Sequence, residues 1–503
     1  MSQREPPDSN RTERDVTESV TPVPLDHGVV VGDVTAKSAI VWTRAAEPAV
    51  VHLEYGPADG FARADRATPR PVEPAVHDGT VRFRLTGLEP ATEYRYRVWA
   101  LAGSGAAAHD DPPAASVDGT FRTAPAPDDD ATVSFVWSGD TYGQGRAPPY
   151  QVPRHMADRD PDFFLYLGDT IYADDPSPAL PDGEPETVDD YRAKYREIRS
   201  AAPNLRHLLA STGTVAIWDD HEVANDWAGQ SEPRLPAART AFFEYWPIDR
   251  HQDVTGSDGG RLYRSFQWGS ALELFVLDTR QYRDENERTD GPEKTMLGAE
   301  QREWLKAGLA DTDATFAVVA SSLSLTSPSS GAAARDGWAD GDADTGFEHE
   351  LAHLVDFIGR EVDRPVVWLA GDRHFARIAS FDVDHDGRPE MYEAMATPIG
   401  AAPREPDEPD PTFGPSIHYQ EGGKYALGEF YNFGEIEVEG EALRISVYDK
   451  AGQRRCSVTI DAAGESWPSV DDARRPRRQS PVPSLGSVLW RRLGATVDRW
   501  RGG

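Results

Sequence analysis

Polar side chains that can bind a metal or move a proton follow the ends of several apolar runs in this chain. Five runs end in such groups, in the order Asp140; Asp169 and Tyr172; Asp219, Asp220 and His221; Asp278 and Arg280; Asp372, Arg373 and His374. One aspartate after a strand is ordinary turn or helix-cap chemistry. Five converging strand ends would bring repelling carboxylates together, and two metal ions are the natural counter-charge.

The local spacing of these residues supports the same interpretation. In the sequence GDTIY, Asp169 and Tyr172 stand three residues apart on one turn, so both can face one cation. In the sequence GDRH, Asp372 and His374 stand two residues apart in an extended loop, so both point to the same side of the chain. In WDDHE, His221 offers a neutral donor beside a carboxylate.

The elements that must position these groups lie between residues 131 and 465. Runs of four to seven apolar residues there fit strands of a central sheet that is covered on both faces. Helical patterns lie between the strands, at 188–200, 298–311 and 347–362. Residues 433–452 are typical of a closing β-hairpin with its turn near Glu439. The pattern predicts an α/β sandwich whose strand ends carry the site.

A separate β-rich region comes first, at residues 26–125. Its short alternating strands predict a small all-β sandwich. The sequence LTGLEPATEYRYRV (85–98) resembles the fibronectin type III signature, in which a tyrosine after a turn pins a strand corner. This region holds no cluster of metal ligands, so we interpret it as scaffold. A linker rich in proline and acid leads from it to the α/β region.

The two ends of the chain differ from the rest. Residues 1–25 are charged and without periodicity, which predicts disorder. Residues 466–503 form a basic tail, in which 484–500 has the spacing of a short amphipathic helix. Two interpretations explain this helix equally well. The helix either contacts an anionic membrane surface or packs onto the acidic α/β region. The N-terminus shows no signal peptide, so a cytoplasmic protein is expected from the sequence.

Composition excludes several classes of protein. Lys and Arg total 52 and Asp and Glu total 85, which gives a net charge of −33, and only six of the 52 bases are lysine. A surface this acidic repels nucleic acid, and an acidic, lysine-poor chain suits a halophilic source. No apolar stretch is long enough to span a membrane. The one cysteine, Cys456, excludes an intramolecular disulfide and a cysteine-rich zinc site.

The motifs, taken together, resemble those of a known family. An Asp, then GDxxY, DDHE and GDxH, in this order across an α/β chain, resemble the metallophosphoesterase arrangement. The phrases IWDDHEVANDW, FVLDTRQYRD and LGAEQREWLKAGLA are similar to those of the PhoD-like alkaline phosphatase family. The resemblance covers roughly residues 25–465. It implies a calcineurin-like catalytic core behind an N-terminal sandwich, with an extracellular or cell-surface location as the alternative to the cytoplasm.

The resemblance also implies which residues hold metal. A first ion would be bound by Asp140, Asp169, Tyr172 and His374, and Asp169 would bridge to a second ion that is also held by Asp220 and Asp372. A phenolate ligand favours Fe³⁺ in the first site. Oxygen ligands in the second site suit Ca²⁺, Mn²⁺ or Mg²⁺ better than Zn²⁺. The chain departs from these families in two ways. It has no cysteine near the first site, where many PhoD-like enzymes have one. Its last motif has one histidine, where general metallophosphoesterases have two.

The implied reaction is hydrolysis of small phosphate monoesters by a water that two metals activate. His221 would protonate the leaving group or bind a phosphate oxygen, and Asn225 is a candidate phosphate donor. Arg280 and Arg373 are candidate phosphate clamps, because a guanidinium can bind phosphate through two hydrogen bonds. A structural ion pair with a neighbouring acid explains either arginine equally well. A phosphodiesterase of the phospholipase D-like kind and a binding protein with a decayed hydrolase domain are the alternatives. A monomer is expected.

Overall fold

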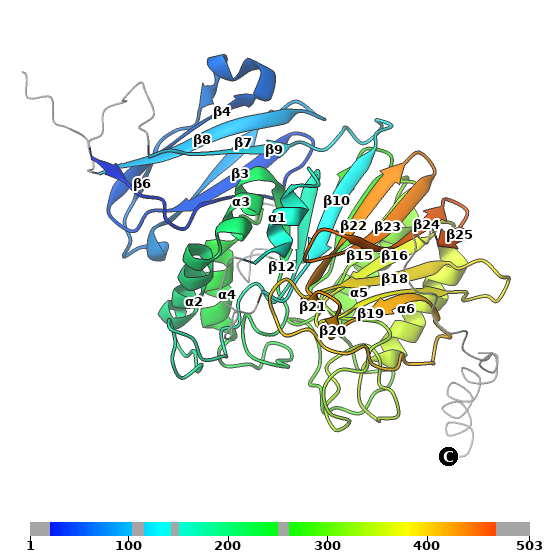
Figure 1. The fold of residues 1–503 in the computed structure, drawn as a ribbon. Helices are drawn as coiled ribbons and strands as arrows, with labels where there is room; N and C mark the ends of the chain where they lie inside the picture. The colour runs from blue at the N-terminus through cyan, green and yellow to red at the C-terminus, as the bar shows by residue number, and fades with distance from the viewer. Residues whose placement is uncertain (1–20, 103–114, 142–149, 250–260, 469–503) are drawn as a thin grey trace, which may run out of the picture.

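The computed structural model describes residues 21–102, 115–141, 150–249 and 261–468. Two large β-sheets lie at the centre of the α/β region, and a third sheet lies at the N-terminal end of the molecule (Figure 1). In these residues no helix is both long and apolar enough to cross a membrane. The predicted amphipathic helix and most of the segment predicted to be disordered lie outside the described residues.

The first sheet has ten strands and supplies three of the predicted strand ends. Its parallel centre is β10 (Val133–Ser138), β11 (Phe163–Leu167) and β12 (Gly213–Ile217). On one side follow the antiparallel strands β22 (Asn432–Glu439), β23 (Ala442–Asp449), β24 (Arg454–Asp461) and β25 (Ser466–Pro468). The strands β22 and β23 confirm the predicted closing hairpin. On the other side come β2 (Val29–Gly32), β3 (Ser38–Arg44) and β7 (Thr80–Thr86).

The second sheet has seven strands and supplies the other two predicted strand ends. Its order is β13 (Arg264–Trp268), β14 (Leu272–Val276), β15 (Phe316–Ala320), β16 (Val366–Ala370), β18 (Met391–Ala396), β17 (Ala376–Phe381) and β19 (Ser416–Glu421). The strands β14, β15, β16 and β18 run parallel. A small separate pair, β20 (Lys424–Tyr425) and β21 (Gly428–Glu429), follows β19 along the chain.

The two sheets pack on each other, so the central sheet that the apolar runs indicated is a pair of packed sheets. In β15, Phe316, Val318 and Ala320 belong to the core shared with the first sheet, whereas Ala317 and Val319 belong to a second core under helices. This alternation follows from the two-residue period of a strand. It explains the continuous apolar runs, because each strand is buried on both faces.

Helices cover the outer face of each sheet. Four of them pack on the first sheet: α1 (Val152–Ala157), α2 (Val188–Ala201), α3 (Pro203–Ser211) and α4 (Leu235–Tyr245). Two pack on the second: α5 (Gly298–Asp311) and α6 (Glu348–Glu361). The three predicted helices are α2, α5 and α6. A capping box of Thr187 and Asp190 begins α2, because each side chain accepts from the other's backbone N–H. The four layers confirm the predicted α/β sandwich.

The N-terminal region is a β-sandwich, as predicted. One of its sheets contains β1 (Pro22–Val23), β4 (Ala49–Pro57), β5 (Asp65–Arg66), β6 (Arg70–Val72), β8 (Glu93–Ala102) and β9 (Val117–Arg122). The other is formed by β2, β3 and β7, and one core lies between them. The Tyr94 hydroxyl accepts the backbone N–H of Glu89 at 2.9 Å, which is the predicted tyrosine corner. Strand β1 pairs with β8, so the end of the segment predicted to be disordered is part of a sheet.

The sandwich and the α/β layers share a β-sheet. Thr214 in β12 pairs in parallel with Gly32 in β2, and the Asp33 N–H donates to the Thr214 carbonyl at 3.2 Å. Beside this junction the buried Arg264 guanidinium contacts the Asp33 carboxylate at 2.9 Å. The Tyr96 hydroxyl donates to the Ala210 carbonyl at the end of α3 at 2.6 Å. The linker near residue 125 is therefore no boundary between separate sheets.

Candidate metal centre

The site lies where the carboxyl ends of the parallel strands of both sheets meet. Gly371, after β16, approaches Leu167, at the end of β11, so closely that a Cβ would lie 3.1 Å from the Leu167 carbonyl oxygen. Gly168 adopts a φ of 83°, and a Cβ there would lie 2.6 Å from the Cβ of Asp219. Only glycine permits both the left-handed backbone and this contact. The glycine before each Asp thus lets the strand ends come together.

Four of the predicted ligands of the first metal converge at this point. Asp140, Asp169 and His374 each present a ligand atom within 4.8 Å of the others, and all three residues are buried. His374 Nε2 lies 3.2 Å from Asp140 Oδ1 and 3.2 Å from the Tyr172 hydroxyl. His374 Nδ1 lies 2.9 Å from the Ala402 carbonyl, which can accept only its N–H. This contact leaves the lone pair of Nε2 directed at the carboxylate and the phenol.

The backbone of these residues is held in an uncommon conformation. Asp140, Asp169, Asp372 and His374 have φ values of 60°, 50°, 64° and 57°. A side chain with a Cβ rarely adopts the left-handed region, and such strain is kept where the surroundings demand it. Four left-handed residues at one point therefore indicate that the fold gives up local stability to aim these side chains.

The predicted ligands of the second metal stand next to the first group. Asp169, Asp220 and His221 also present ligand atoms within 4.8 Å of one another. Asp372 has a buried Oδ2 without a hydrogen-bond partner among the described residues. Burial raises the pKa of Asp372 well above its usual value, and the charges of Asp219 and Asp220 raise it further. The structure thus brings five of the six predicted ligands into contact groups, and Asp372 interacts electrostatically with Asp219 and Asp220 beside them.

The centre has the electrostatics of a site built for cations. Burial raises the pKa of Asp169 well above its usual value, and Asp220, Asp219 and Asp140 raise it further. Asp140 is only 1% exposed, and within the described part of the chain neither of its carboxylate oxygens has a hydrogen-bond partner. A buried carboxylate without a donor is costly, and metal coordination satisfies it. Oxygen donors with one imidazole are a set that hard metal ions accept. The residues present therefore fit two metal ions.

His221 is oriented by an acid that the sequence did not single out. Its Nδ1 lies 2.7 Å from Asp174 Oδ1, and its ring stacks on Tyr172 with 4.1 Å between the centroids. Burial lowers the pKa of His221, but Asp220 and Asp174 outweigh it and raise the pKa to about 10. Asn225 is exposed, and its backbone N–H donates to Asp174 Oδ2 at 2.6 Å. Asp174 thus holds both predicted catalytic residues of this loop.

The two predicted arginines form ion pairs. Arg280 is fully buried, and its guanidinium contacts Asp219 at 2.6 Å and Asp336 at 3.1 Å. These contacts favour the ion-pair alternative, in which Arg280 neutralises the acids of the centre, and its role as a phosphate clamp stays a prediction. Arg373 contacts Asp407 at 2.8 Å and keeps 14% of its side chain exposed. Its role as a clamp stays a prediction.

Two further groups at the centre escaped the sequence analysis. Glu222 is buried and accepts the backbone N–H groups of Asp169, Thr170 and Asp219 at 2.6–3.2 Å, so it braces two of the ligand turns at once. Burial raises the pKa of Glu222 to about 7. Asp336, far along the chain, presents a ligand atom within 4.8 Å of those of Asp220 and Asp226. Glu222 stands in the quoted motif WDDHE, whereas no local pattern marks Asp336.

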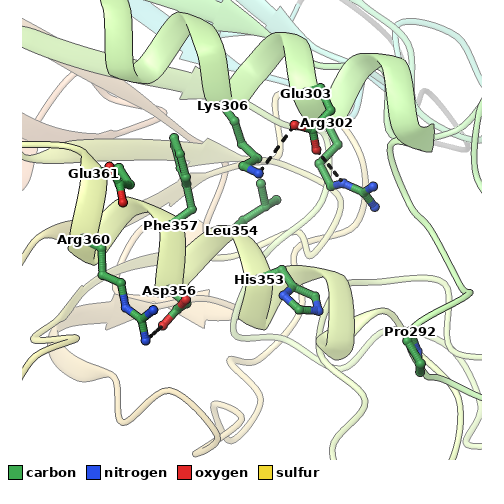
Figure 2. A pocket seen from close by; sticks show the side chains of 10 residues that line it. All are labelled: Pro292, Arg302, Glu303, Lys306, His353, Leu354, Asp356, Phe357, Arg360 and Glu361. Carbon is green, nitrogen blue, oxygen red and sulfur yellow. Dashed lines mark ion pairs between the residues drawn. The ribbon is translucent and has the colours of Figure 1, made fainter.

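A surface pocket lies away from this centre. It has a volume of about 390 Å³ and lies between α5 and α6 (Figure 2). Its charged side chains largely pair with one another, as Lys306 does with Glu303 and Arg360 with Asp356. None of the predicted ligands lines it. The chemistry therefore belongs to the strand ends and not to this pocket.

The family models match nearly the whole described chain. Residues 134–447 match the PhoD-like phosphatase model, and residues 10–125 match the model of the N-terminal domain of PhoD-like phosphatases. The chain belongs to the PhoD-like phosphatase family. The β-sandwich and the α/β layers correspond to these two models, which agrees with the resemblance seen in the motifs.

Known relatives agree with this assignment. The chain is 29% identical over 411 residues to alkaline phosphatase D of Bacillus subtilis (strain 168). The aligned region covers 72% of this chain and 66% of that protein. The fold is similar to a solved structure of PhoD, with a TM-score of 0.72, 23% identity, and 90% and 93% of the two chains covered. It is also similar to the purple acid phosphatase PPD1 from yellow lupin, with a TM-score of 0.57, 15% identity and 88% and 74% covered.

Proposed function

We propose that this protein is a metal-dependent phosphoesterase that hydrolyses small phosphate monoesters. The strongest support is the convergence of Asp140, Asp169 and His374 with Tyr172, in a place where the Asp140 carboxylate accepts no hydrogen bond from the residues that the structure describes. A decayed hydrolase would have lost ligands, and this chain keeps a donor at every predicted position. The family assignment and the 29% identity to alkaline phosphatase D support the same reaction class.

The proposed assignment of metal ligands is the one that the family resemblance implies, and the groups at the strand ends support it. Asp140, Asp169, Tyr172 and His374 would hold one ion, and Asp169, Asp220 and Asp372 would hold the other. Bound metal ions neutralise phosphate oxygens and lower the pKa of water, which supplies the nucleophile. The phenol of Tyr172 supports Fe³⁺ in the first site, and the carboxylates around the second support Ca²⁺, Mn²⁺ or Mg²⁺, with Zn²⁺ as the remaining alternative.

The protein's own groups would orient the substrate and move the proton. Asp174 fixes the ring of His221 through Nδ1, so Nε2 is the atom that would donate its proton to the leaving oxygen. Asn225 is exposed on the same loop and would donate to a phosphate oxygen. Arg373 would approach the phosphate only by turning part of its guanidinium away from Asp407. Glu222 would keep the turns of Asp169 and Asp219 rigid during the reaction, because it accepts their backbone N–H groups.

The test compares a monoester with a diester on the same protein. We expect hydrolysis of p-nitrophenyl phosphate to exceed that of bis-p-nitrophenyl phosphate, to vanish with chelator and to return with metal. A stronger response to the diester would replace the proposal by a phosphodiesterase. No hydrolysis of either compound by metal-loaded protein would favour the non-catalytic binding protein.

A further inference from the structure

Three carboxylates outside the metal centre converge beside the start of helix α6. Asp340 lies in the loop before the helix, Glu348 is its first residue, and Asp410 lies on a segment between β18 and β19. One carboxylate oxygen of each lies within 4.8 Å of the other two. The three residues are only 5–6% exposed. None of them belongs to the centre described above.

One carboxylate oxygen of this group differs from the others in its hydrogen bonding to the described residues. Asp410 Oδ1 accepts the Thr412 N–H at 2.7 Å, and Glu348 accepts the Asp340 N–H and the Thr412 hydroxyl at 3.2 Å. Asp410 Oδ2 is buried and has no hydrogen-bond partner among the described residues. Since a buried carboxylate oxygen without a partner is costly, this atom indicates a ligand that completes the group.

The chain brings Asp340 to this place through a tight loop. Gly346 adopts a φ of 112°, and a Cβ there would lie 2.7 Å from the Cβ of Asp340. Any larger residue at position 346 would collide with Asp340, so the loop could not keep this conformation. On the other side, the Asp410 N–H donates to the Thr326 carbonyl at 2.7 Å, which ties the two loops together beside the carboxylates. The approach of the three acids is thus built into the fold.

We propose that Asp340, Glu348 and Asp410 bind a Ca²⁺ ion separate from the catalytic metals. The donors are all oxygens, which excludes the cysteine and histidine ligands that structural zinc sites use. Ca²⁺ accepts six to eight oxygen ligands in flexible geometry, and carboxylates bind it through one or both oxygens. Mg²⁺ usually keeps several of its waters, which fits a buried group of three carboxylates less well.

The ion would connect two loops that support the metal centre. The segment that carries Asp410 also carries the Ala402 carbonyl, which contacts His374, and Asp407, which contacts Arg373. The loop that carries Asp340 also carries Asp336, which contacts Arg280. A cation bound between these loops would hold both loops in place. The ion itself would lie away from the reacting atoms, so its role is structural.

The first experiment counts Ca²⁺ ions. Chelator-treated protein is titrated with CaCl₂ and the bound calcium is measured by equilibrium dialysis for the wild type, Asp410→Asn, Glu348→Gln and the control Asp342→Asn. Asp342 is exposed in the same loop and outside the group. We expect both variants of the group to bind one Ca²⁺ fewer per chain than the wild type, and the control to bind as many. Equal binding by all four proteins would overturn the proposal.

The second experiment does not depend on the folding of those variants. Asp169→Asn removes a ligand that both catalytic metals would share, so this chain reports on the remaining site. We expect chelated Asp169→Asn protein to bind one Ca²⁺ per chain and to gain thermal stability from CaCl₂. If CaCl₂ neither binds nor raises its melting temperature, the three acids instead share protons and the proposal fails, whatever the wild type hydrolyses.

Discussion

The Asp169→Asn substitution should make the metal-free protein more stable while it removes activity. Asp169 stands within 4.8 Å of Asp140 in one group and of Asp220 in another. At an effective dielectric constant of about 20, two unit charges at this distance repel by roughly 3.5 kcal/mol. The amide removes the charge but keeps the shape. Loss of one such repulsion should raise the free energy of unfolding of the chelated protein by about that amount.

The assay is thermal unfolding at pH 9 with chelator, because the raised pKa of Asp169 lets it take up a proton at lower pH. With an unfolding entropy of about 2.1 cal/mol/K per residue, 3.5 kcal/mol corresponds to about 3 °C for a chain of 503 residues. The exposed Asp128→Asn serves as control and should not shift the melting temperature. A chelated Asp169→Asn protein that melts at or below the wild type would refute the idea of uncompensated charges. With metal present, the same variant should lose at least about 100-fold in kcat/KM.

Three further outcomes are expected. Tyr172→Phe should remove the visible phenolate-to-iron absorption of concentrated protein, and a colourless, iron-free, active wild type would contradict the ferric assignment. His221→Ala should lower kcat about 100-fold with unchanged metal content by elemental analysis, because general acids contribute at least this much; loss of metal would make His221 a ligand instead. Asp78→Asn should lower the free energy of unfolding at pH 7 by about 2 kcal/mol, since Asp78 contacts Arg44, Arg196 and the Tyr245 hydroxyl. Burial raises the pKa of Asp78, but these partners outweigh it and lower the pKa below its usual value. The contribution is therefore present above about pH 4 and fades as the pH falls through the native pKa, which thermal melts from pH 7 to 3 would reveal.

The ligands were predictable because their signal is local. An apolar run followed by Gly-Asp marks the end of a buried strand, and parallel strand ends meet at one edge whatever the rest of the fold does. Asp140, Asp169 and Asp372 follow this Gly-Asp pattern directly, Tyr172 and His374 stand within three residues of it, and Asp220 follows an apolar run that ends in Trp218 and Asp219. The helices α2, α5 and α6 were predictable for a similar reason, because their apolar spacing is contained within each segment.

The parts of the site and of the fold that the sequence did not predict depend on contacts between distant segments. Asp174 and Asp336 lie in loops without periodicity, and only the folded chain shows that they meet His221 and Arg280. Whether an arginine faces substrate or an acid is decided by the same distant contacts, so the sequence could not choose for Arg280. The back-to-back packing of two sheets was also hidden, because a strand buried by helices and one buried by another sheet have the same apolar pattern.

The strand pairing between β12 and β2 has a consequence for how the two regions can be separated. Strand β12 is the last parallel strand of the catalytic layers in its sheet, and β2 covers the side of it that would otherwise be open. A chain cut near residue 125 would leave backbone N–H and C=O groups of a fully buried, apolar strand exposed at an edge, which is a template for pairing with other chains. We therefore expect the N-terminal region to protect this edge from aggregation as well as to act as a scaffold. On this argument the two regions should fold well only when they are expressed together.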